Sequence, residues 1–165
     1  MQTFLNTASW SKTKKICVSG MVAAMYIAIM LATQAFAFGA YQVRIATALY
    51  ALAYFYPFLI FPLGLANGLS NFIGSMGPWD MPGGTLVGII TSGAVYAVRR
   101  YKLPTLLIVP IITLIPGLIV PIWLSPVTGV PYTLLAVQIS IGQLTPAVVG
   151  YVFVKTLTKM QRKTQ

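Results

Sequence analysis

The sequence has no histidine, a single cysteine (Cys17) and a single carboxylate side chain (Asp80) among its 165 residues. Metal clusters, Ser-His-Asp triads and paired catalytic carboxylates each need residues that are missing here. One cysteine forms no internal disulfide bond. The sequence also lacks a glycine-rich phosphate-binding loop ending in Gly-Lys-Ser/Thr. We therefore expect a binding or transport protein with no catalytic residues, no metal site and no cofactor.

Charged residues are scarce, at 7% of the chain, whereas 58% of the residues are hydrophobic. A soluble domain has about 25% charged and about 45–50% apolar residues. The net charge of +10 arises from bases that lie beside apolar runs and not along one continuous face. This distribution is typical of cytoplasmic loops of membrane proteins and argues against nucleic-acid binding. The clusters are Lys12, Lys14 and Lys15; Arg99, Arg100 and Lys102; and Lys155, Lys159, Arg162 and Lys163.

The apolar runs predict an all-α bundle of six transmembrane helices, forming a single multi-pass domain of the cell membrane over residues 1–165. Both termini are expected in the cytoplasm, with short basic tails at 1–15 and 156–165. The basic start of the first run also resembles a secretory signal, but this run is longer than a usual signal core. Proline and glycine predict turns near 57–64 and 74–84, an outer loop at 125–131 and kinks in the fifth run. The expected crossings are 16–38, 44–61, 63–76, 83–98, 103–124 and 132–155.

Small residues recur every four positions in the first run, which predicts a smooth stripe along one helix face. Such a stripe lets another helix backbone approach closely. It serves either packing within the bundle or docking of a partner protein. The stripe consists of Gly20, Ala24, Ala28 and Ala32.

Arg44 and Asp80 belong to none of the basic clusters, and an isolated ionisable residue near a membrane is often functional. The alternatives are that they pair with each other or lie in water. Aromatic residues beside them form either a lipid belt or stacking surfaces for a flat solute. Uncharged polar residues inside the apolar runs turn toward other helices or a cavity. The aromatic and polar candidates are Tyr41, Gln42, Trp79, Trp123 and Tyr132, together with Asn67, Asn71, Gln138, Ser140, Gln143 and Thr145.

Three segments resemble a known transporter family. Ala23-Ala-Met-Tyr-Ile-Ala28 resembles the first helix of substrate-binding S components of energy-coupling factor (ECF) transporters. Tyr41-Gln-Val-Arg-Ile-Ala-Thr-Ala-Leu49 and Gly77-Pro-Trp-Asp-Met-Pro-Gly-Gly84 are similar to the QueT family, S components for queuosine precursors. The resemblance extends from about residue 16 to residue 155. At Thr47 the family commonly has glutamate, and this departure puts the substrate and the partner of Arg44 in question.

The resemblance implies that the chain lies in the lipid bilayer and captures a 7-deazaguanine-type base from outside the cell. It then docks through the small-residue stripe on a membrane coupling subunit served by two ATPase subunits. A guanine-like edge carries two parallel donors, which the carboxylate of Asp80 can accept together. The expected substrate-binding residues are Tyr41, Gln42, Arg44, Asn71, Trp79, Asp80, Trp123, Tyr132 and Gln138.

Two other functions remain open at this point. The chain could be an accessory subunit of a larger membrane complex, without a solute pocket and with Arg44 and Asp80 as a structural pair. It could also be a self-contained facilitator. Bound solute separates the S component from the accessory subunit, and copurified ATPase subunits separate it from the facilitator.

Overall fold

The computed structural model describes residues 7–39, 41–74 and 79–163, and within these ranges all regular secondary structure is helical. The all-α class predicted from hydropathy is therefore confirmed. Parts of the predicted tails (1–6 and 164–165) and of the predicted turn at 74–84 (75–78) lie outside the described residues.

Five helical segments are long and apolar enough to cross a membrane. Two of them are compound: the 3₁₀ helix η3 (Pro57–Leu59) leads into α4, and η4 (Thr105–Leu107) leads into α6 and α7. Shorter elements are η1 (Thr7–Ser9), α3 (Gln34–Ala37) and the ten-residue 3₁₀ helix η2 (Ile45–Tyr54). The longer helices are α2 (Lys12–Ala32), α4 (Ile60–Gly74), α5 (Asp80–Arg100), α6 (Ile108–Ile119), α7 (Pro121–Thr128) and α8 (Tyr132–Lys163).

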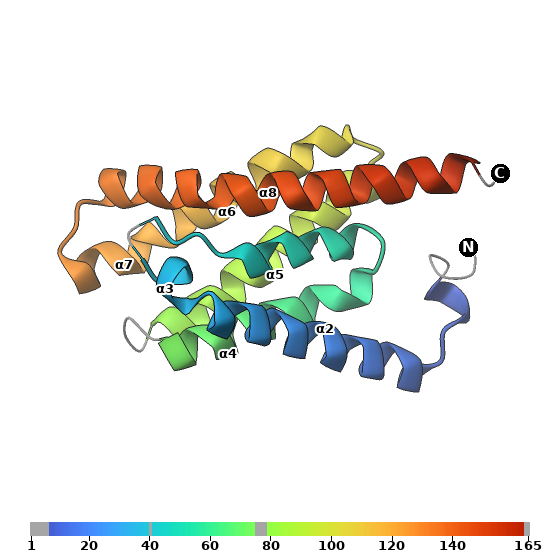
Figure 1. Cartoon of the computed structure of the whole chain (residues 1–165), viewed down its shortest axis with the longest axis horizontal. Helices are drawn as coiled ribbons and strands as arrows, with labels where there is room; N and C mark the ends of the chain where they lie inside the picture. Colours follow the sequence, from blue (N-terminus) through green and yellow to red (C-terminus); the bar gives the residue numbers. More distant parts are fainter. Residues whose placement is uncertain (1–6, 40, 75–78, 164–165) are drawn as a thin grey trace.

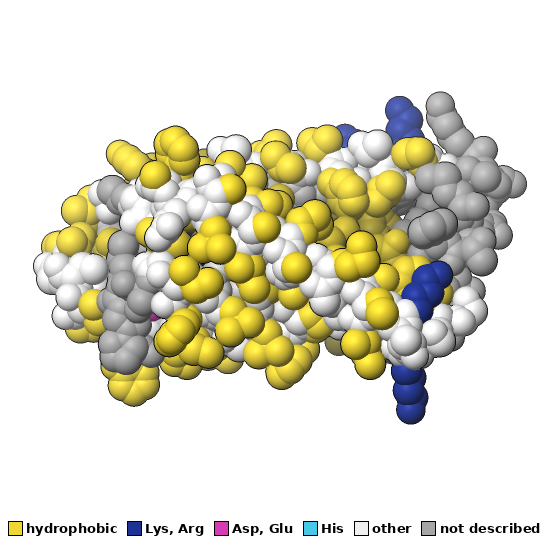
Figure 2. Space-filling model, turned by 60° about the horizontal axis from the view of Figure 1, so that its bottom comes forward, with side chains coloured by type: hydrophobic (Ala, Val, Ile, Leu, Met, Phe, Trp, Pro, Cys, Tyr) yellow, Lys and Arg dark blue, Asp and Glu magenta, His cyan; other side chains and the backbone are white. Residues whose placement is uncertain are grey.

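The segments lie roughly side by side along an elongated bundle (Figure 1). The start of α2 and the end of α8 lie at one end, whereas α3, α7 and the start of α5 lie at the other. Lysine and arginine side chains gather at the first of these ends in Figure 2, and hydrophobic side chains cover much of the remaining face. This face of the bundle thus has a basic end and an apolar surface suited to contact with lipid.

The second predicted crossing, 44–61, differs from expectation. The structure has the 3₁₀ helix Ile45–Tyr54, a bend at residues 55–56, and a new helical segment from Pro57. A 3₁₀ helix rises about 2.0 Å per residue, so ten residues reach about 20 Å where an α-helix would reach about 15 Å. The turn predicted at 57–64 is wrong, because these residues are helical and the chain bends before them, at 55–56. Pro62 lies in the first turn of α4, where its missing N–H is tolerated.

Other predicted boundaries also need correction. α5 begins at Asp80 and has 21 residues, so it is not the short helix expected at 83–98. Helix α7 continues through Pro126 to Thr128, leaving only 129–131 of the predicted outer loop, and Gly129 with φ 72° ends it. Helix α8 continues to Lys163, and its 32 residues span about 48 Å, longer than a hydrocarbon core of about 30 Å. The interruption expected in the fifth run occurs at Val120, between α6 and α7.

Close helix packing holds the site end of the bundle together. Helix α4 packs against α5, and α6 packs against α8. A Cβ placed on Gly88 of α5 would lie 2.8 Å from the Cα of Gly64 in α4, so the two backbones touch where neither residue has a side chain. Tyr26, Tyr50 and Leu63 are among the fully buried residues of the core that joins α2, η2 and α4.

Candidate functional site

The connection between α3 and η2 carries Gln42 and Arg44 into the bundle, where they are only 3% and 4% exposed. Gln42 adopts a left-handed backbone conformation with φ 46°, which few non-glycine residues do. Helix α8 approaches this connection closely, because a Cβ on Gly142 would overlap the carbonyl oxygen of Tyr41. The position of the two polar side chains therefore depends on a backbone contact with a distant helix.

One nitrogen of the Arg44 guanidinium is held by two asparagines of α4. Nη1 donates to Oδ1 of Asn71 at 2.8 Å and to Oδ1 of Asn67 at 3.3 Å. Nε and Nη2 are buried and have no hydrogen-bond partner. The guanidinium carbon lies over the ring of Phe38, 5.2 Å from the ring centroid, so the ring covers one face of the guanidinium. Arg44 is thus fixed at one nitrogen, with its other donors unused.

The asparagines connect Arg44 to three further elements. Asn67 donates to the carbonyl of Gly84 in α5 at 2.7 Å, and its Oδ1 accepts from the Tyr26 hydroxyl of α2 at 3.1 Å. The Tyr26 hydroxyl lies 3.2 Å from that of Tyr50 in η2. Since Asn67 accepts from Tyr26 and from Arg44 with the same oxygen, a shift of α4 disturbs both contacts.

A second set of hydrogen bonds fastens the connection to α8. Gln143 donates from Nε2 to the carbonyl of Gln42 at 3.2 Å. The Thr47 hydroxyl lies 2.7 Å from Oε1 of Gln143 and 2.7 Å from the carbonyl of Arg44. The contact from Gln143 uses the backbone carbonyl of Gln42, while the side-chain Oε1 of Gln42 stays buried and unpartnered.

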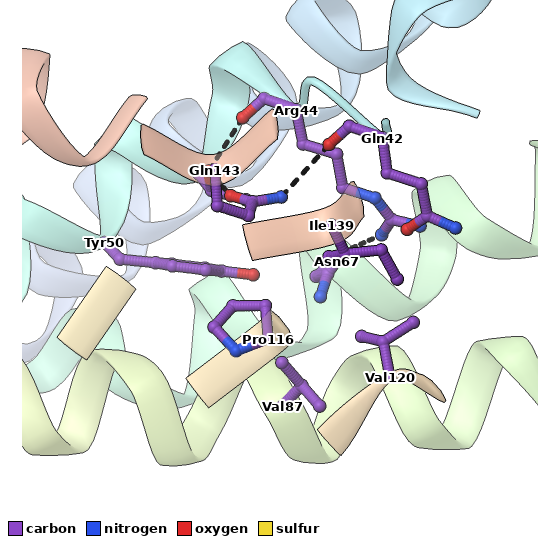
Figure 3. Close-up of a pocket in the computed structure, with 10 residues that line it drawn as sticks. Gln42, Arg44, Tyr50, Asn67, Val87, Pro116, Val120, Ile139 and Gln143 are labelled. Atoms are coloured by element: carbon purple, nitrogen blue, oxygen red, sulfur yellow. Dashed lines mark hydrogen bonds between the residues drawn. The ribbon is translucent and has the colours of Figure 1, made fainter. Parts of the chain in front are cut away.

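Two neighbouring spaces share Gln42 in their walls. The inner one is a polar cavity of about 10 Å³, room for about one water molecule (Figure 3). The outer one is a mainly apolar pocket of about 290 Å³, close to the lower limit for small-molecule sites. The inner cavity is lined by Gln42, Arg44, Thr47, Tyr50, Asn67, Val87, Pro116, Val120, Ile139 and Gln143. The outer pocket is lined by Phe38, Gly39, Gln42, Leu124, Thr128, Val130, Leu134, Leu135 and Gln138.

Asp80, at the first position of α5, is 3% exposed. Its Oδ1 accepts from Nε1 of Trp123 at 3.2 Å, and its backbone carbonyl accepts from Asn71 at 3.0 Å. The side-chain Oδ2 is buried without a hydrogen-bond partner. Asp80 and Arg44 are therefore linked indirectly, through Asn71. Trp123 contacts Oδ1, so Oδ2 is the carboxylate oxygen of Asp80 that has no partner among the described residues.

A family model described as the QueT transporter matches residues 16–159, which include every residue that lines the two spaces. The chain belongs to the QueT transporter family. Its membership and its apolar helices of membrane-spanning length identify it as a membrane transport protein. Searches of curated proteins and of solved structures returned no match.

The residues expected at the site are only partly brought together. Gln42 lines both spaces, Arg44 lines the inner cavity, and Gln138 lines the outer pocket. Asn71, Asp80 and Trp123 are connected to Arg44 by the contacts described above. The remaining three aromatic residues are more open: Trp79 is 66% exposed, Tyr41 is 52% exposed and Tyr132 is 40% exposed, with its hydroxyl donating to the carbonyl of Leu118.

Four polar residues of the inner cavity lie outside the expected substrate-binding set. Asn67 and Gln143 carry the signal of uncharged polar side chains within apolar runs, and this signal is sufficient to find them. Tyr50 carries no such signal, because tyrosine is common in membrane helices for other reasons. Thr47 is marked in the sequence only as the position where the family commonly has glutamate. The cavity is lined by all four: Thr47, Tyr50, Asn67 and Gln143.

The small-residue stripe of α2 is exposed along its whole length. All four of its residues lie on the outer surface, and a Cβ on Gly20 would meet no other atom within 4 Å. The opposite side of α2 buries Tyr26 and Met30 in the core. The stripe is therefore available to another molecule, and it does not pack against another described element.

Proposed function

We propose that this chain is the substrate-binding S component of an ECF-type importer. In this role it captures a queuosine precursor, a 7-deazaguanine-type base or a similar small solute, from outside the cell and delivers it inward. The observation that carries the proposal is the pair of buried side chains, Gln42 and Arg44, whose unpartnered polar atoms adjoin a cavity in a member of the QueT transporter family. A buried polar atom without a partner costs free energy, which a ligand can recover by completing the hydrogen bond.

The proposed topology has six crossings of the cell membrane and both termini in the cytoplasm. The five long segments and the shorter Ile45–Tyr54 together supply these crossings. The start of α2 and the end of α8 lie at the same end, where the basic side chains gather, and basic loops resist translocation. In this orientation the inner cavity, the outer pocket and Asp80 lie toward the outside.

The exposed stripe of α2 is the proposed docking surface for a membrane coupling subunit that is served by two ATPase subunits. Replacing Ala24 or Ala28 by leucine fills the groove that a partner helix needs. We expect this change to abolish transport and copurification of the ATPase subunits, while solute binding by the isolated chain stays nearly intact. Val149→Leu, an enlargement of an exposed side chain on α8, is the control and retains the partners. Equal loss of solute binding in the α2 variants would make the stripe an internal surface.

The substrate is tested with the full chain purified in detergent. Mass spectrometry of the small molecules released on denaturation is expected to find a 7-deazaguanine base, and calorimetric titration with 7-deazaguanine is expected to show saturable binding. A released solute of another chemical class, with no response to 7-deazaguanine, would remove the substrate assignment. A folded protein that releases and binds no solute would instead favour an accessory subunit.

A further inference from the structure

Two buried side chains beside the inner cavity present complementary unused groups. Arg44 offers donors at Nε and Nη2, and Gln42 offers an acceptor at Oε1. The two side chains run next to each other from the same connection, toward the space near Val120 and Ile139 (Figure 3). The cavity wall thus has hydrogen-bond donors directly beside an acceptor.

The Arg44 guanidinium and the backbone of Gln42 are held in place by contacts that leave these atoms free. Arg44 is anchored through Nη1 by Asn67 and Asn71. The backbone of Gln42 is anchored by Gln143 of α8, and the N–H of Gln42 donates to the carbonyl of Gly39 at 3.0 Å. Groups whose orientation is fixed before binding lose little entropy when a ligand contacts them. A ligand whose polar groups match the donors of Arg44 and the acceptor of Gln42 is therefore expected to bind more tightly than a ligand whose groups do not match.

We infer that Arg44 and Gln42 together recognise a lactam edge, in which a carbonyl oxygen stands next to a ring N–H. The carbonyl accepts from the free edge of Arg44, and the ring N–H donates to Oε1 of Gln42. This inference rests on the proposed capture of a nucleobase, and it assigns the oxo-bearing edge as the part that is selected. In an amino-substituted base the donor and the acceptor of this edge exchange places: an amino group stands where the carbonyl was, and an unprotonated ring nitrogen stands where the ring N–H was. Its amino group finds no acceptor on Arg44, because a guanidinium has none in any rotamer.

The adjoining outer pocket supplies the room that the inner cavity lacks. A cavity of about 10 Å³ holds no base, whereas the outer pocket of about 290 Å³ reaches Gln42. Phe38 belongs to the wall of this pocket and also contacts the Arg44 guanidinium. The apolar walls cover the faces of the ring, and the lactam edge points to Gln42 and Arg44.

The first test compares two probes on the purified wild-type chain. Calorimetric titration with 7-deazaguanine and with 7-deazaadenine is expected to give affinities that differ by about 100-fold in favour of the oxo compound. Equal affinities would overturn the lactam assignment and leave nucleobase capture standing. Binding of neither probe to the folded protein would overturn the proposed function itself.

The second test uses Gln42→Glu, which introduces a carboxylate beside the free edge of Arg44. We expect this variant to melt at a higher temperature, because the carboxylate satisfies the unpartnered N–H groups, and to bind 7-deazaguanine at least tenfold more weakly. Gln34→Glu makes the same change at the exposed start of α3 and is the control. If Gln42→Glu melts no higher than Gln34→Glu, or binds as tightly as the wild type, the free edge of Arg44 is not a recognition surface.

Discussion

Replacing Gly142 by alanine probes the contact that sets the position of the candidate site. The added Cβ would overlap the carbonyl oxygen of Tyr41 and lie 2.8 Å from its carbonyl carbon and 3.2 Å from that of Gln42. These are backbone atoms, so the connection that carries Gln42 and Arg44 must move away from α8. The movement lengthens the 3.2 Å hydrogen bond between Gln143 and the Gln42 carbonyl.

The magnitude follows from two opposing effects. Overpacking a core costs about 1–3 kcal/mol, whereas alanine in place of glycine within a helix gains about 1 kcal/mol. Gly93→Ala in α5 isolates the second effect, because a Cβ there would meet no atom within 4 Å. We therefore expect the free energy of unfolding of Gly142→Ala to fall about 1–3 kcal/mol below that of Gly93→Ala.

Both variants are compared by chemical denaturation in detergent and by calorimetric titration with 7-deazaguanine. Displacement of Gln42 is expected to weaken binding at least tenfold in Gly142→Ala, which corresponds to about 1.4 kcal/mol, and to leave Gly93→Ala unchanged. If Gly142→Ala is as stable as Gly93→Ala and binds equally well, the contact between α8 and the connection does not position the site.

Three further changes test the topology and the polar network. A cysteine introduced at Val127 in a chain without its native cysteine is expected to react with an impermeant reagent from outside, and one at Lys102 is not; strong labelling at Lys102 would refute the six crossings. Asp80→Asn keeps an oxygen for Trp123 but loses the free carboxylate oxygen. Affinity for 7-deazaguanine is therefore expected to fall about tenfold, as for the loss of a charged hydrogen bond of about 1.5–3 kcal/mol. Wild-type affinity together with a lower melting temperature would show that Asp80 has a structural role only. Thr47→Val removes a buried hydroxyl with little change of shape and is expected to lower the free energy of unfolding by about 1 kcal/mol, and an unchanged denaturation midpoint would exclude its hydrogen bonds as stabilising contacts.

Local patterns are sufficient to predict the class of this protein and much of its framework. Hydropathy depends on composition over about 20 residues, so the apolar runs identify membrane-spanning helices without knowledge of their neighbours. The rarity of polar side chains within these runs likewise marks Asn67, Asn71 and Gln143 as inward-facing, and these three are buried. The same expectation is wrong for Thr145, which is exposed on α8. The ends of the helices are harder to predict from such local patterns. The predicted turn at 74–84 and outer loop at 125–131 contain Pro82 and Pro126, yet α5 and α7 include these prolines, because a helix tolerates proline in its first turn and can bend around it elsewhere.

The contacts of the candidate site depend on which helices meet and at what rotation, and no local pattern contains this information. Sequence proximity places Trp79 next to Asp80, but Trp79 is exposed and the indole that contacts Asp80 belongs to Trp123, 43 residues away. Arg44 and Asp80 are the two isolated charges of the chain, yet Arg44 is held by Asn67 and Asn71. These pairings arise because α4 and α5 approach each other at Gly64 and Gly88, and because α8 approaches the connection at Gly142, where the absence of a side chain allows close backbone contact. The unused donors of Arg44 and the unused acceptor of Gln42 are a property of that packing.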